Sequence, residues 1–195
     1  MQNLVVVAHP DDETIWMGGL ILRNPQIDWQ ICTLCRADDP DRAPRFFRAM
    51  EALGASGRMS DLDDSPVLAP LSPELYEIKE RIADLAGLEF DYVFTHGAHG
   101  EYTHHPRHAQ IHRAIIEMMK TGELCGELAC FAYEDGGGDY TPRPSVDART
   151  LVCLTDEEME KKRHIIRDIY GFAEGSWEFE AAGRMEALDS SLAFL

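Results

Sequence analysis

The fold of this chain is decided by residues 4–13, Leu-Val-Val-Val-Ala-His-Pro-Asp-Asp-Glu. The first five of these residues are apolar and mostly β-branched, which is typical of a strand buried on both faces of a parallel sheet. His9 ends the run, and Pro10 begins a turn that carries three consecutive carboxylates. Because ligands of open α/β sheets bind beyond the carboxyl ends of the strands, we expect this turn to lie at the functional edge.

The rest of the chain alternates strand and helix patterns. Strands are predicted over residues 29–34, 92–95, 128–133 and 151–154, and helices over 14–23, 42–53, 71–85, 106–119 and 155–170. Gly54 ends one helix, and Thr155 with Glu158 forms a capping box at the start of another. This alternation predicts one α/β domain, residues 1–195, whose mostly parallel sheet is flanked by helices. Residues 171–195 show no clear pattern.

Charge and hydropathy exclude several classes of partner. The chain has 195 residues, of which 18 are basic and 35 acidic, for a net charge of −17. Such a surface repels phosphate backbones and anionic lipid, so we expect no nucleic-acid partner. No apolar run reaches the roughly 18 residues of a membrane span. The first residues lack the basic region of a signal peptide, which predicts a cytoplasmic protein. Of the five cysteines, Cys32 and Cys35 form a C-x-x-C within a predicted strand, and without a second such pair they are expected to be buried, reduced thiols.

A second segment rich in potential metal ligands follows the strand predicted over residues 92–95. Six of the eight histidines lie between residues 96 and 112. His105 and His108 flank the start of the helix that begins at Pro106, and zinc and iron(II) sites take histidine and carboxylate ligands from such positions. Four others, taken singly, are expected to be ordinary loop or core histidines: His96, His99, His104 and His112.

Two histidines and one aspartate would leave open positions on a bound ion, as in a catalytic zinc site. Zinc lowers the pKa of bound water, and a second carboxylate can accept the proton as water attacks a carbonyl. A histidine on the opposite side can stabilise the oxyanion that forms. The same ligand set also suits a non-hydrolytic iron(II) enzyme, but the neighbouring Asp11 favours hydrolysis, which needs a base.

These segments resemble the LmbE-like, or PIG-L, family of zinc-dependent N-acetylglucosaminyl deacetylases. The resemblance rests on Ala-His-Pro-Asp-Asp-Glu at residues 8–13 and on His105-x-x-His108. It extends to Met17-Gly18-Gly19, to Arg42 twelve residues before Gly54, and to residues 93–97, 100–102 and 162–170. Residues 1–170 carry the resemblance, and residues 171–195 form a C-terminal extension.

The resemblance implies a Rossmann-like fold and removal of an N-acyl group, N-acetyl above all, from a small amino sugar or glycoconjugate. It implies a Zn²⁺ cofactor, with Fe²⁺ as the alternative. The implied roles are metal ligands for His9, Asp12 and His108, general base for Asp11, oxyanion stabiliser for His105 and substrate contact for Arg42.

Several alternatives stay open. Arg107 stands where many relatives carry an acidic residue beside the oxyanion histidine, and the approach to the motif also allows His104 to pair with His108. The three tryptophans, Trp177 among them, could line a sugar site, although core packing is favoured. The substrate could be another N-acyl compound, such as a thiol conjugate or an antibiotic intermediate. A non-catalytic metal-binding relative is a further alternative, and the sequence leaves a homo-oligomer open.

Overall fold

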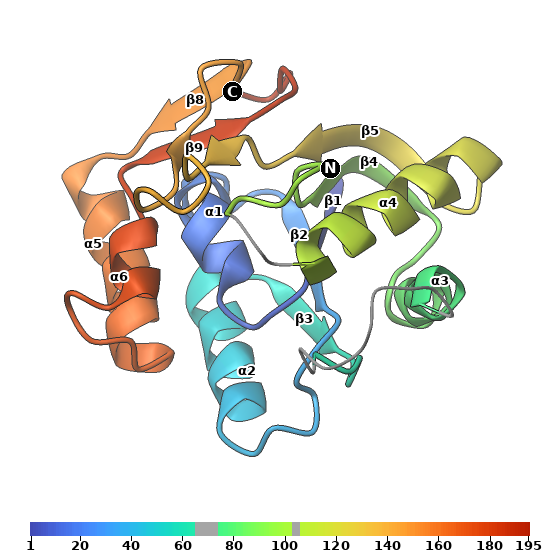
Figure 1. Cartoon of the computed structure of the whole chain (residues 1–195), viewed down its shortest axis with the longest axis horizontal. Helices are drawn as coiled ribbons and strands as arrows, with labels where there is room; N and C mark the ends of the chain where they lie inside the picture. The colour runs from blue at the N-terminus through green and yellow to red at the C-terminus, as the bar shows by residue number, and fades with distance from the viewer. Residues whose placement is uncertain (65–73, 103–105) are drawn as a thin grey trace.

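Five parallel strands form the central sheet of the protein (Figure 1). The computed structural model describes residues 1–64, 74–102 and 106–195. The sheet order is β3-β2-β1-β4-β5, where the strands are β1 Gln2–Val7, β2 Asp28–Thr33, β3 Ser56–Met59, β4 Glu89–Thr95 and β5 Cys125–Cys130. Every neighbouring pair in this sheet is parallel, which confirms the predicted α/β fold.

Helices cover both faces of the sheet (Figure 1). One face is covered by α1 Asp12–Arg23 and α2 Arg42–Leu53, and the other by α3 Glu74–Leu85 and α4 Pro106–Thr121. Alternate residues of β1 belong to two different apolar cores, one on each face. This burial on both sides is why residues 4–8 are apolar without interruption.

The C-terminal third packs against α1 and α2. It contains β6 Tyr133–Glu134, β7 Arg143–Pro144, β8 Thr150–Cys153, α5 Asp156–His164, a π-helix Ile165–Ile169, α6 Trp177–Ala181 and β9 Met185–Leu188. Residues 171–195, for which the sequence predicts no pattern, supply α6 and β9. Phe179, Ala187 and Leu188 of this segment are buried in the same apolar core as α1 and α2.

The structure corrects two of the predicted elements and adds one strand that was not predicted. The strand predicted over 128–133 ends earlier, at Cys130, and begins at Cys125 on exposed residues that carry no apolar pattern. Strand β3 was not predicted, because Ser-Gly-Arg-Met is short and not apolar. The helix predicted over 155–170 changes to a π-helix at Ile165, although its capping box at Thr155 is present as predicted.

Helix α1 is broken at Met17, where φ is −149° and ψ is 15°. The freed amides of Gly19 and Leu20 donate to the carboxylate of Glu186 at 2.8 and 2.7 Å. Lys162, fully buried, neutralises Glu186 at 2.7 Å. A Cβ at position 19 would lie 2.3 Å from a methyl carbon of Leu154, so the Met-Gly-Gly sequence allows the C-terminal third to pack closely on α1.

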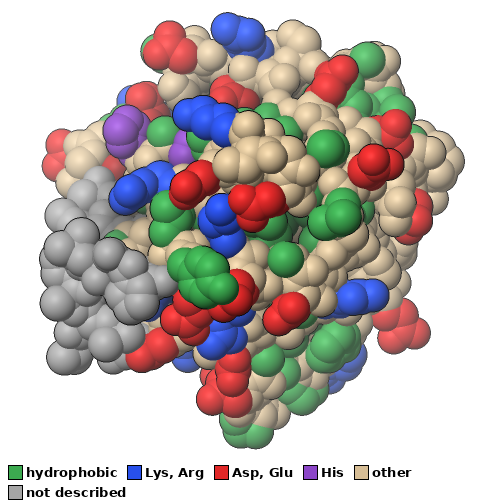
Figure 2. All heavy atoms as spheres, turned by 90° about the vertical axis from the view of Figure 1, so that its right-hand side faces the viewer, with side chains coloured by type: hydrophobic (Ala, Val, Ile, Leu, Met, Phe, Trp, Pro, Cys, Tyr) green, Lys and Arg blue, Asp and Glu red, His purple; other side chains and the backbone are tan. Residues whose placement is uncertain are grey.

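Charged side chains of both signs are interspersed with isolated apolar ones on the molecular face shown in Figure 2. Among the described residues, no helix is long and apolar enough to cross a membrane. Cys32 and Cys35 are buried free thiols, as predicted, whereas Cys125 and Cys153 are exposed.

Candidate active site

The turn after β1 folds back on its own carboxylates. The amide of His9 donates to Asp12 Oδ2 at 2.8 Å, and the amide of Asp11 donates to Glu13 Oε2 at 3.1 Å. Asp11 has φ 126°, a backbone conformation that L-residues rarely adopt. Such strain persists where surrounding contacts hold it, and it is common at functional sites. The turn thereby presents Asp11 and Asp12 side by side at the carboxyl edge of the sheet.

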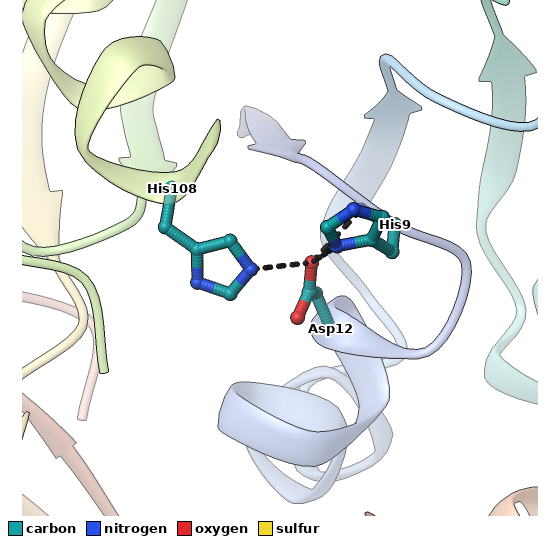
Figure 3. Close-up of side chains that lie close together, drawn as sticks. All are labelled: His9, Asp12 and His108. Carbon is teal, nitrogen blue, oxygen red and sulfur yellow. Dashed lines mark hydrogen bonds and ion pairs between the residues drawn. The ribbon is translucent and has the colours of Figure 1, made fainter. Parts of the chain in front are cut away.

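Figure 3 shows both imidazoles, from the turn after β1 and from α4, pointing at one oxygen of Asp12. His9 Nδ1 and His108 Nε2 each lie 3.3 Å from Asp12 Oδ2. Ligands bound about 2.0–2.1 Å from a tetrahedral zinc lie roughly 3.3–3.4 Å apart. The spacing and the donor types of this His9–Asp12–His108 cluster therefore fit such an ion.

Glu101 orients the imidazole of His108 from behind. Its Oε2 lies 2.5 Å from His108 Nδ1 and 2.8 Å from His96 Nδ1, and its Oε1 accepts from the amide of Gly97 at 2.8 Å. His96 Nε2 accepts from the amide of Ala8 at 2.9 Å, so His96 carries its proton on Nδ1. Carboxylates that hold a metal-binding histidine in this way fix its tautomer and orientation.

Asp64 holds the other histidine. His9 Nε2 lies 3.0 Å from Asp64 Oδ1, and Arg36 lies 3.1 Å from Asp64 Oδ2. Two further groups of potential metal ligands share residues with the cluster, His9 with Cys35 and Asp64, and His96 with Glu101 and His108. His9, Asp12 and Asp64 line the cavity described below, whereas His96, Glu101 and His108 are buried and are not part of its described lining.

Electrostatics keep the two carboxylates around His108 ionised. Burial raises the pKa of Glu101, but His96 and His108 outweigh this effect and lower it to about 2. Burial likewise opposes ionisation of Asp12, yet His108 and His9 hold its pKa well below the usual range. The pKa of His108, which burial lowers, is raised to about 9 by Asp12 and Glu101.

Asp11 is in the opposite situation. Burial and the neighbouring charge of Asp12 raise its pKa well above the usual range, and Arg42, 3.4 Å from Asp11 Oδ2, only partly offsets them. Arg42 begins α2 and stacks on the ring of Phe172 with its guanidinium carbon 4.5 Å from the centroid. A carboxylate with a raised pKa is suited to exchanging protons near neutrality.

A cavity of about 200 Å³ opens beside the cluster. This volume is smaller than the roughly 300–1,000 Å³ of sites that hold drug-sized ligands, so the cavity has room for one small ring or chain at a time. Its described lining comprises His9, Pro10, Asp11, Asp12, Ile15, Arg36, Arg42, Asp64, Tyr102, Trp177 and Glu178.

Five of the six predicted site residues are thus brought together: His9, Asp11, Asp12, Arg42 and His108. His105, the sixth, and its alternative His104 lie outside the described residues. Arg107 is 7% exposed and donates to Gln110 on its own helix at 2.7 Å. The sequence analysis assigned no role in the site to Glu101 or Asp64, and it favoured core packing for Trp177. The signal that pointed to any of these three residues was the family resemblance of Gly100-Glu101-Tyr102.

Comparisons with solved structures show the same fold at low sequence identity. A conserved protein from Thermus thermophilus has a TM-score of 0.68 and 19% identity, covering 100% of this chain and 97% of that one. N,N'-diacetylchitobiose deacetylase from Pyrococcus horikoshii has a TM-score of 0.63 and 19% identity, covering 91% and 73%. The 4-carboxy-2-hydroxymuconate hydratase from Pseudomonas putida has a TM-score of 0.61 and 20% identity, covering 93% and 82%.

A search of curated protein sequences gives no match. The sequence model of the PIG-L family, described as GlcNAc-PI de-N-acetylase, matches residues 4–119. This stretch is more than half of the chain and includes the turn after β1, Arg42 and the start of α4. The chain belongs to the PIG-L family.

Proposed function

We propose that this protein is a metal-dependent hydrolase that removes an N-acyl group, N-acetyl above all, from an amino sugar or glycoconjugate. The observation that carries the proposal is the convergence of His9, Asp12 and His108 on one point beside Asp11, in a cavity open to substrate. A zinc ion fits the donor set, and iron(II) takes the same ligand types. The family description, a de-N-acetylase, supports an amide substrate. The fold alone does not distinguish the reaction, because a deacetylase and a hydratase share it.

The chemistry follows from the placement of the side chains. A metal bound by His9, Asp12 and His108 would supply a Lewis acid that polarises the amide carbonyl and lowers the pKa of water. Asp11 takes a proton from the attacking water and returns it to the leaving amine. Arg42, 3.4 Å from Asp11, orients this carboxylate and contacts the substrate in the same cavity. His105 is proposed, on the family motif, to stabilise the oxyanion.

Metal-reconstituted protein tests the proposal. Protein stripped with chelator and reloaded with zinc or iron(II) is expected to bind about one ion per chain and to release acetate from N-acetylglucosamine derivatives. His108→Ala should lose the metal, with His164→Ala, an exposed histidine on α5, as the matched control.

The other outcomes are distinguishable. Turnover of N-acyl thiol conjugates or antibiotic intermediates, but of no sugar, would replace the substrate class. Metal binding without hydrolysis of any amide would make the protein a non-catalytic relative, and hydration of an unsaturated acid would overturn the hydrolase. The cytoplasmic location and a homo-oligomer stay predictions, for cell fractionation and sedimentation to test.

A further inference from the structure

One wall of the catalytic cavity comes from the C-terminal segment. Trp177 and Glu178 line the cavity together with His9, Asp11 and Asp12. Both belong to α6, which lies outside the residues matched by the family model. The wall is therefore built from a part of the chain that the family match does not describe.

The indole of Trp177 is held firmly and yet exposed. Its ring lies 4.5 Å from that of Tyr102 and 6.3 Å from that of Trp16, centroid to centroid. Ser176 caps α6 by accepting from the amide of Phe179 at 3.3 Å, which fixes Trp177 as the first helical residue. Despite these contacts Trp177 remains 39% exposed, whereas Trp16 and Trp29 are buried in the core.

The exposed ring adjoins the reacting groups. Trp16, which Trp177 contacts edge to face, donates from Nε1 to Asp12 Oδ1 at 3.1 Å. A ligand held against Trp177 in this narrow cavity is thus held next to Asp12 and Asp11. Apart from Ile15, Pro10 and the aromatic rings, the described lining is charged.

A cavity with one aromatic wall and charged surroundings is complementary to a pyranose ring. The C–H bonds on one face of such a ring carry partial positive charge and are attracted to the negative face of an aromatic system. Its hydroxyl groups need hydrogen-bond partners when they leave water. Charged acceptors make the stronger of such bonds, and Glu178 places a carboxylate on the same wall.

We propose that Trp177 stacks against the pyranose ring of the substrate and that Glu178 accepts a hydrogen bond from one of its hydroxyl groups. This proposal rests on the proposed function and deepens it, since α6 then selects cyclic amino sugars over acyclic N-acyl amines. Trp177 and Glu178 are specificity residues that leave the hydrolysis itself to the cluster and Asp11.

Trp177→Leu removes the aromatic face and keeps an apolar side chain. With methyl N-acetylglucosaminide we expect KM to rise about tenfold, equivalent to 1.4 kcal/mol, with kcat little changed. With an acyclic amide such as N-acetylethanolamine we expect no change. Glu178→Gln should raise KM for the sugar alone, with the exposed Glu180→Gln as its control. Equal losses on both substrates, or no loss on the sugar, would overturn the proposal.

A binding measurement separates this proposal from the proposed function. Titration with methyl N-acetylglucosaminide should quench the tryptophan fluorescence of the wild type saturably, whether or not any amide is hydrolysed. The quench should vanish in Trp177→Leu and survive in Phe47→Leu, which alters an exposed aromatic side chain of α2. If Trp177→Leu folds poorly, Trp177→Phe replaces it in the test. This variant retains an aromatic ring and should keep part of the affinity for the sugar. Absence of a quench in the wild type would overturn the stacking.

Discussion

Replacing Glu101 by Gln should weaken metal binding, although Glu101 is not among the proposed ligands His9, Asp12 and His108. His108 must keep Nε2 free for the metal, and His96 accepts the Ala8 amide on Nε2, so both present an N–H at Nδ1. With the amide of Gly97, three donors converge on the Glu101 carboxylate. A glutamine offers one acceptor oxygen, and its NH₂ group must then face a donor.

The magnitude follows from the same contacts. The pKa of Glu101 falls from the ordinary 4.5 to about 2, which corresponds to about 3 kcal/mol in favour of the ionised form in the folded protein. Because this pKa is lowered on folding, the stabilisation is present above about pH 4.5 and is lost as the pH falls towards 2. Loss of a carboxylate that orients a metal-binding histidine typically costs about 10- to 100-fold in affinity.

The assay compares Glu101→Gln with Glu117→Gln, the same change on the exposed side of α4. Zinc affinity is measured by chelator competition at neutral pH, and the visible spectrum of the Co²⁺ form reports the ligand geometry. Urea unfolding of the metal-free proteins gives the stability difference. If Glu101→Gln bound zinc as tightly as Glu117→Gln and unfolded at the same urea concentration, the carboxylate would not orient His108.

Three other changes test the remaining parts of the site and its support. Asp11→Asn should lower kcat by about 10²- to 10⁴-fold with metal content retained, because a general base is lost while the cluster is intact; unchanged turnover would exclude that role. In metal-free protein, His108 has its pKa raised from 6.5 to about 9, so its stabilising contribution is present below pH 6.5 and should fade as the pH rises through 9; urea unfolding at several pH values checks this. Gly19→Ala should destabilise the fold by about 1–3 kcal/mol, since its Cβ would lie 2.3 Å from Leu154, and a wild-type melting temperature would contradict the close packing of α1.

The proposed metal-binding part of the site is predictable because its signals are local. An apolar run that ends in His-Pro-Asp-Asp-Glu indicates both a buried strand and a polar turn at the edge of the sheet. Pro106 marks the start of α4 and so places His108 in its first turn. Since β1 and β4 are parallel neighbours, the loops that follow them meet at one edge, which brings Asp12 near His108.

The supporting and substrate-facing residues have no local signal. Glu101 acquires its role only when β1 and β4 pair and His96 reaches the amide of Ala8, 88 positions away. Strand β3 pairs with β2 and lies against α2 at Gly57, although Ser-Gly-Arg-Met carries no pattern that predicts a strand. Trp177 looks like a core residue in the sequence, and only the docking of α6 makes it a cavity wall.

These two kinds of residue leave the chemistry and the specificity separately adjustable. The cluster is held from the turn after β1 and from α4, whereas the aromatic wall is held by α6 and by contacts to Tyr102 and Trp16. The buried Lys162–Glu186 pair joins the two, because it anchors the broken end of α1 to the segment that carries α6 and β9. A substitution at Trp177 or Glu178, the two α6 residues that line the cavity, should therefore change which amide is bound, whereas one at Glu186 should disturb α1 and with it the proposed ligand Asp12.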